Sequence, residues 1–180
     1  MTSEALQRVH CWLERWVIGL NLCPFASYPY GQGRVRVVAC ESPDTDKLFE
    51  FVLDEIELLL SKSVDELETS VLIAEAALTD FDDYLEYLEL LQRVVGDTGL
   101  EGVIQIASFH PDYCFADVEP DDVANFTNRS PYPLFHLIRE NSLEQALAHY
   151  DQPETIPQRN VQLLRDMGLQ KVRQYLSACD

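Results

Sequence analysis

The feature that most constrains the fold of this chain is an alternation of strand and helix patterns between residues 34 and 108. Three short β-branched runs are typical of strands: Arg34–Cys40 (RVRVVAC), Thr69–Ala76 (TSVLIAEA) and Val103–Ser108 (VIQIAS). The order strand, helix, strand, helix, strand predicts two successive βαβ units. Right-handed crossovers would make these strands parallel, with helices covering the sheet.

The intervening segments repeat apolar residues at helical spacing. The first, from Pro43 to about Lys62, places Leu48, Val52, Ile56 and Leu59 on one face; the second places Phe81, Tyr84, Leu85, Leu88 and Leu91 inward. Further helices are predicted over residues 3–20, from Ser142 to Tyr150 and from Pro157 to Leu176. We therefore expect one α/β domain over residues 1–180: a small βαβαβ sheet, parallel or mixed, flanked by helices. A ferredoxin-like α+β sheet is the alternative, because three strands alone make a small sheet.

The charge balance limits the kinds of partner. Thirteen Lys and Arg stand against 31 Asp and Glu, which gives a formal net charge of −18. Residues 41–99 alone hold 17 acidic and three basic side chains. Such a field repels nucleic-acid phosphates and anionic lipid heads, so neither a nucleic acid nor a membrane is an expected partner. The acidic side chains either form solvated helix faces or dock a basic protein.

The cysteines predict an intracellular chain. Five are present, an odd number without CxxC spacing: Cys11, Cys23, Cys40, Cys114 and Cys179. The first fifteen residues do not resemble a signal peptide, and no apolar run approaches the roughly 20 residues that span a bilayer. We therefore expect reduced thiols and a cytoplasmic location.

The segment from Phe109 to about Glu140 is the predicted functional site. It has little periodicity, and structureless segments beyond about 12 to 15 residues are uncommon in compact domains unless they carry function or are disordered. Its aromatic content argues for an ordered loop. Directly after the third strand, His110 and Asp112 could act as a base with its orienting partner, or as two metal ligands. A turn histidine and a capping aspartate are the alternative reading.

Two further groups in this segment suit ligand binding. Asn128, Arg129 and Ser130 offer donors for a carboxylate or phosphate, with Arg139 and Tyr113 as further binding residues. His136, Arg139 and Glu140 would share one face if Leu134 to Asn141 forms a helical turn, so that His136 and Glu140 could ligate a metal with His110 and Asp112. Internal salt bridges and a surface cluster are the alternatives.

Cys23 is the candidate thiol, since it follows a helix end and precedes Pro24 and Phe25. A helix C-terminus has the wrong dipole sign to activate a thiol, so a tertiary neighbour such as His110 would have to do so. A buried structural cysteine is the alternative.

Four strings resemble a family of uncharacterised bacterial proteins of about 180 residues, classed as a domain of unknown function. They are Gly19–Ala26 (GLNLCPFA), Ser108–Tyr113 (SFHPDY), Asn128–Pro133 (NRSPYP) and His136–Glu140 (HLIRE). The resemblance runs over most of the chain and implies a bacterial cytosolic protein. It implies no activity, cofactor or catalytic residue, so the cofactor stays unknown.

Two functions follow from these residues. In the first, the chain is an enzyme acting on a small anionic metabolite, with His110 and Asp112 as acid–base pair, Arg129 and Arg139 as anion clamp and Cys23 as thiol. In the second, it is a non-catalytic binding or protein-interaction module with an acidic surface. A concave, partly apolar pocket beside His110 would favour the enzyme, whereas a flat, fully packed loop would favour the module. The oligomeric state is not predicted.

Overall fold

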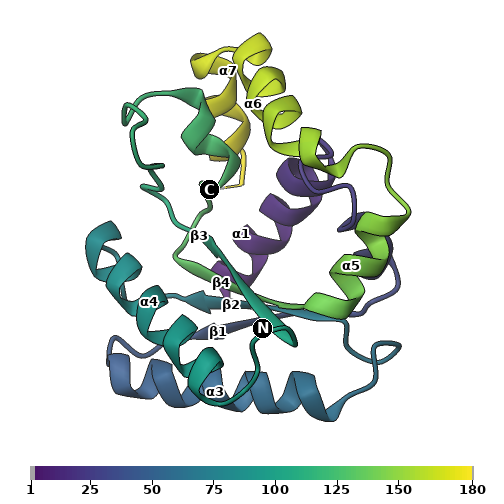
Figure 1. Ribbon diagram of the computed structural model, residues 1–180. Coiled ribbons are helices and arrows are strands. Elements are labelled where there is room, and N and C mark those ends of the chain that lie inside the picture. The colour runs from purple at the N-terminus through teal and green to yellow at the C-terminus, as the bar shows by residue number, and fades with distance from the viewer. Residues whose placement is uncertain (1–2, 180) are drawn as a thin grey trace.

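The computed structural model of the protein describes residues 3–179, with a four-stranded sheet between layers of helices (Figure 1). The strands are β1 (Val35–Cys40), β2 (Thr69–Ala74), β3 (Ile104–Phe109) and β4 (Leu134–Arg139). The α-helices are α1 (Glu4–Trp12), α2 (Ser27–Gly31), α3 (Thr45–Ser61), α4 (Phe81–Asp97), α5 (Glu140–Ala148), α6 (Ile156–Met167) and α7 (Leu169–Ser177). A π-helix, η1 (Leu13–Ile18), continues α1, and η2 (Val123–Thr127) and η3 (Pro153–Thr155) are short 3₁₀ helices.

The sheet is mixed and has the strand order β1-β2-β4-β3. β1 and β2 pair in parallel, whereas β4 is antiparallel to both of its neighbours. The mixed α/β class and the three predicted strands are confirmed, with ends that differ by one or two residues. The predicted βαβαβ order is not confirmed, because β4 separates β2 from β3, and neither is the ferredoxin-like alternative.

β4 is the strand that sequence reasoning missed. The apolar run Leu134–Ile138 fits a short strand and a helical turn about equally well, since a run of this length has no decisive period. Pairing with β2 on one side and β3 on the other fixes it as a strand. The helical turn expected over Leu134–Asn141 is therefore wrong, and α5 begins only at Glu140.

One face of the sheet packs against α3 and α4. Tyr84 lies buried at this interface, and its hydroxyl donates to the Leu134 carbonyl (2.7 Å) while it accepts from the Phe109 N–H (3.1 Å). One side chain thus joins the end of β3 to the start of β4. The stripes predicted for these helices are buried here, in full on α3 and at Tyr84, Leu88 and Leu91 on α4.

The opposite face carries α1, α6 and α7, which form a second core around Trp16, Leu164 and Val172. The terminal helices begin and end elsewhere than predicted: η1 replaces the last turns of the first helix, and Gly168 divides the last one. Gly168 has φ 79°, a conformation that glycine adopts without a steric penalty. Of the helices within residues 3–179, none has an apolar stretch long enough to cross a bilayer.

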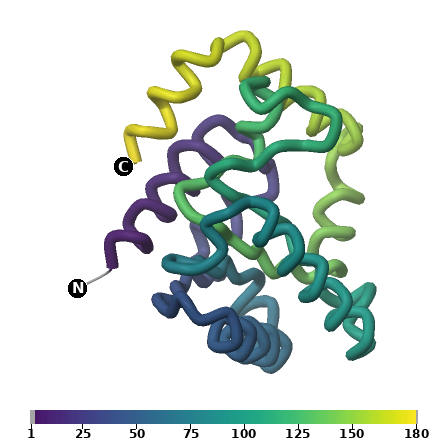
Figure 2. The backbone as a smooth tube through the Cα atoms, turned by 90° about the vertical axis from the view of Figure 1, so that its left-hand side faces the viewer, coloured from purple at the N-terminus to yellow at the C-terminus, as the bar shows by residue number. Residues whose placement is uncertain are grey.

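A disulfide links the two ends of the chain. Figure 2 shows the N-terminal and C-terminal helices ending on the same side of the molecule, where Cys11 bonds Cys179. The expectation that all five cysteines are reduced is therefore wrong for this pair. The bridge spans 168 positions of sequence, so no local spacing indicates it. Cys23, Cys40 and Cys114 are free thiols.

Candidate functional site

His110 follows β3, but its ring is enclosed. The Asp112 backbone N–H donates to Nδ1 (3.0 Å), so the ring proton lies on Nε2, which donates to the Leu78 carbonyl (3.0 Å). The side chain is fully buried, and this burial lowers the pKa of His110. The Asp112 side chain is exposed, and its charge raises the pKa of His110 by less than burial lowers it. The arrangement matches the alternative reading of a neutral turn histidine.

Arg129 holds the loop after β3 together. Its Nε donates to the Tyr113 carbonyl (3.2 Å) and its Nη2 to the Pro120 carbonyl (2.8 Å), while the guanidinium lies 4.3 Å from the centre of the Phe126 ring. Burial lowers the pKa of Arg129. The Tyr113 ring packs against Phe115, with ring centroids 4.9 Å apart. Through these contacts the Arg129 guanidinium stabilises the loop itself.

The structure does bring His110 and the 128–130 segment side by side. The His110 backbone N–H donates to the Asn128 carbonyl (3.2 Å), and Asn128 Nδ2 donates to the Ser108 carbonyl (3.1 Å). The Ser130 hydroxyl donates to the Tyr132 carbonyl (2.6 Å). Their polar atoms are thus engaged with backbone groups. The catalytic and anion-binding roles of these residues stay predictions.

His136, Arg139 and Glu140 do not share a face. On a strand, residues three apart point to opposite sides, so His136 and Arg139 face opposite layers. The Arg139 guanidinium donates to three backbone carbonyls around the C-terminal end of α3, those of Leu59, Lys62 and Leu67. Glu140 begins α5. Within residues 3–179, no group of three or more His, Cys, Asp or Glu side chains is placed to hold a metal ion.

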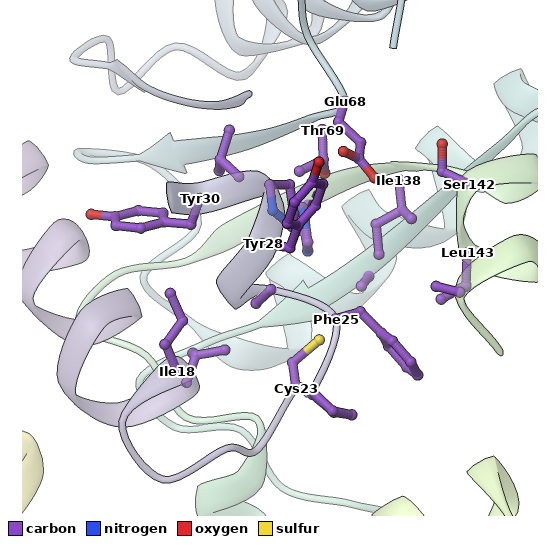
Figure 3. Close-up of a pocket in the computed structure, with 18 of the residues that line it drawn as sticks. Ile18, Cys23, Phe25, Tyr28, Tyr30, Glu68, Thr69, Ile138, Ser142 and Leu143 are labelled. Carbon is purple, nitrogen blue, oxygen red and sulfur yellow. Dashed lines mark hydrogen bonds between the residues drawn. The ribbon is translucent and has the colours of Figure 1, made fainter. Parts of the chain in front are cut away.

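A cavity of about 530 Å³ opens on the sheet face that carries α1 (Figure 3). Its floor consists of alternate strand residues, which are Val35, Thr69, Val71, Ala107, Phe109, His136 and Ile138. Its walls come from α1 and η1, from residues 23–30, and from α5 with the two residues after it, His149 and Tyr150. This volume lies within the range of small-molecule sites, roughly 300 to 1,000 Å³.

The segment that follows η1 delivers one wall of the cavity. A Cβ built on Gly19 would lie 2.3 Å from the Arg15 carbonyl oxygen, so glycine lets the chain turn tightly out of the π-helix. Asn21 then adopts a left-handed conformation, with φ 52°. This turn places Cys23, Pro24 and Phe25 against the cavity. The Gly19–Ala26 string therefore has a structural meaning: it is the turn that builds the wall.

His136 is the polar group at the centre of the floor. Thr69 on β2 is the diagonal neighbour of His136 on β4. The Thr69 hydroxyl lies 2.5 Å from His136 Nε2 and donates its proton to the Leu137 carbonyl (2.6 Å). Because a hydroxyl has one proton, Thr69 must accept from Nε2, which therefore carries the ring proton. Burial lowers the pKa of His136 to about 4, so the ring is neutral at pH 7.

The second nitrogen of this ring is open. Among the described residues 3–179, Nδ1 has no hydrogen-bond partner, and the atom is accessible rather than buried. Since the ring lines the cavity, Nδ1 meets the cavity as a free hydrogen-bond acceptor.

Cys23 offers a thiol to the same space. Figure 3 shows its sulfur turned toward the cavity. Burial raises the pKa of Cys23, and this outweighs the lowering effect of the Phe25 and Ala26 N–H groups and of the charge on Arg159. The side chain is therefore a neutral thiol at pH 7. A nucleophilic role for Cys23 stays a prediction.

Comparison with known proteins places the chain in a family. The model of a family described as "Protein of unknown function (DUF1415)" matches residues 4–174. The chain belongs to this family. Comparison with curated proteins and with solved structures gives no match. All residues of the cavity lie inside the segment that matches the DUF1415 model.

The cavity joins residues that sequence reasoning selected for other reasons. Cys23, His136 and Arg139 were candidate site residues, and all three line it. Glu68, Thr69 and Ser142 were missed, since they come from the edge of a strand and the start of a helix and carry no motif. The role of His136 Nδ1 as an open acceptor becomes visible only when β4 is paired between β2 and β3.

Proposed function

We propose that this DUF1415 protein binds a small, largely apolar molecule in the cavity over the sheet. The observation that carries the proposal is the floor of the cavity. In a closed core, inward residues of a central strand are covered, whereas His136 and Ile138 on β4 are only partly buried and face open space. An apolar site with a few polar groups is the usual form of a small-molecule site.

The lining disfavours an anionic ligand. Among the described lining residues, Arg139 is the one Arg or Lys, and its guanidinium donates to the carbonyls around α3. The formal net charge of −18 adds a repulsive field. We therefore propose a small-molecule site at this cavity, ahead of the anionic metabolite predicted for the 109–140 segment.

Thermal unfolding with neutral probes tests the proposal. We would use 4-phenylbutan-1-ol and 1-naphthol on the wild type and on Ala107→Phe. Ala107 lies opposite His136 in the β3–β4 register, so a phenyl ring there fills the floor. Ala148→Phe is the control, since Ala148 is exposed and does not line the cavity.

A probe at one hundred times its dissociation constant should stabilise the wild type and Ala148→Phe by about 2.7 kcal/mol and leave Ala107→Phe unchanged. Because Ala107→Phe itself changes packing, its own unfolding temperature without probe shows that it folds. Equal stabilisation of all three proteins, or of none, would contradict the proposal.

The bacterial origin and the cytoplasmic location expected from the sequence also belong to the proposal. The Cys11–Cys179 bond bears on the location, since disulfides persist in oxidising compartments and are rare in the cytosol. Counting free thiols in protein isolated under acid quench tests it. Five free thiols in the quenched protein support the cytoplasmic location, even where the purified protein holds the Cys11–Cys179 bond, and three contradict it.

A further inference from the structure

The polar groups of the cavity differ in what they can accept from a ligand. Nδ1 of His136 is a lone-pair acceptor whose ring proton is held at Nε2 by Thr69. It accepts a hydrogen bond from an N–H or O–H group, and a carboxylate or phosphate oxygen has nothing to donate to it. The cavity therefore selects for a donor at the centre of its floor.

Glu68 adds a carboxylate to the lining of the same cavity. It immediately precedes Thr69, lines the cavity and is partly buried. Figure 3 shows its carboxylate turned toward the cavity, between Thr69 and Ile138. Within residues 3–179, its side chain makes no hydrogen bond or ion pair, although its backbone N–H donates to the Arg34 carbonyl (2.9 Å). The Glu68 carboxylate is therefore available to accept a hydrogen bond or an ion pair from a ligand.

Among the lining residues that the structure describes, no Arg or Lys side chain pairs with Glu68. The Arg139 guanidinium turns to the other face of the sheet, and the Arg34 guanidinium pairs with Asp65 at 2.9 Å outside the lining. Ser142, across the cavity on α5, offers a hydroxyl that can donate or accept. A positive charge for the Glu68 carboxylate is therefore expected from the ligand.

We propose that the ligand of this cavity is a small amine with an apolar body, whose ammonium group binds the Glu68 carboxylate and donates to Nδ1 of His136. This inference rests on the proposed function, because it names the chemical class of the molecule that the cavity takes. The apolar body lies against Val71, Ile138 and Phe25.

Three probes share one apolar body and differ only in their polar group: 4-phenylbutylamine, 4-phenylbutan-1-ol and 4-phenylbutanoate. Calorimetric titration at pH 7.5 gives each dissociation constant. The amine is expected to bind at least tenfold more tightly than the alcohol, and the carboxylate more weakly than both.

Glu68→Gln should bring the amine to within threefold of the alcohol and leave the alcohol itself unchanged. Glu41→Gln is the matched control, because it removes one negative charge at the opposite end of β1 and Glu41 does not line the cavity. It should leave the amine preference intact. If Glu68→Gln and Glu41→Gln weaken amine binding equally, the preference for the amine comes from the overall charge of the protein. That result would overturn the inference.

The outcomes separate the inference from the proposed function. Equal binding of amine and alcohol, with both lost in Ala107→Phe, would overturn the amine and retain the cavity as a site. Tight binding of the carboxylate would overturn the amine as well. No binding of any probe to the wild type would count against the proposed function itself.

Discussion

Thr69 decides which nitrogen of His136 faces the cavity. Its hydroxyl has one proton, and this proton goes to the Leu137 carbonyl, so the imidazole must donate from Nε2 and keep Nδ1 as an acceptor. At the same scale, His110 has both nitrogens engaged by backbone groups. Two histidines of one segment thus differ in chemistry because their neighbours from distant parts of the chain differ.

The depressed pKa of His136 predicts a pH dependence of stability. The folded value of about 4 lies below the unfolded value of about 6.5, so between these pH values the unfolded chain binds more protons. The stabilisation is present above pH 6.5 and is lost as the pH falls toward 4. Urea unfolding of the wild type should show this loss, and His136→Asn should show less of it. His149→Asn, at an exposed position, should behave as the wild type; equal slopes for His136→Asn and wild type would contradict the assignment.

Tyr84→Phe tests the junction of β3 and β4. The change leaves the Phe109 N–H and the Leu134 carbonyl without their partner in a buried place, so we expect a loss of about 1 to 3 kcal/mol in the free energy of unfolding. Tyr87→Phe removes a single bond, to the Thr45 carbonyl, at a more open position and should cost less. Urea unfolding measures both. A smaller loss for Tyr84→Phe than for Tyr87→Phe would contradict this role.

At the scale of elements, the sequence predicts those strands and helices that a local residue pattern determines. It does not predict the strand that depends on pairing with other strands. β1, β2 and β3, and the buried stripes of α3 and α4, follow from periodicity within single segments. β4 forms a strand because it pairs between β2 and β3, and this pairing determines which side of the sheet each of its side chains faces. The same dependence explains why His136 was expected beside Arg139 and Glu140, when it lies beside Thr69 and Ala107.

The loop after β3 gives an element-scale prediction for Arg129. Its guanidinium joins the Tyr113 and Pro120 carbonyls across the loop, so Arg129→Ala should loosen residues 110–127. We expect faster limited proteolysis in this loop and a loss of about 1 to 3 kcal/mol of stability. Arg173→Ala removes an exposed ion pair with Asp121 and is the control, with little change expected. Unchanged proteolysis in Arg129→Ala would show that the loop does not depend on these bonds.

At the scale of the whole molecule, the two faces of the sheet are unlike. α3 and α4 close one face, whereas the other combines the helices of both chain ends with a cavity. The Cys11–Cys179 bond ties those ends together, and 168 positions of sequence separate the two cysteines. A cross-link over so long a loop lowers the conformational entropy of the unfolded chain and so stabilises the fold by up to about 5 kcal/mol. Neither the bridge nor the cavity could be predicted, because both arise from segments far apart in the sequence.

Alkylation in denaturant tests the bridge. Purified protein, unfolded without reductant, should take up three labels, at Cys23, Cys40 and Cys114, and five after reduction. Reduction should also lower the unfolding temperature, and Cys11→Ser should reproduce that decrease. Mass spectrometry counts the labels. Five labels before reduction would show that the two ends are not bonded in the isolated protein.

Titration of 4-phenylbutan-1-ol into methyl-labelled protein, followed by NMR, tests the central claim that the cavity is a binding site. If the cavity binds the alcohol, the methyl signals of Val71, Ile138 and Leu143 should shift, because these residues line the cavity. The Val52 and Ile56 methyls, buried on α3 across the sheet, should not move. Shifts confined to the α3 side, or no saturable shift at any methyl group, would show that the cavity is not the binding site.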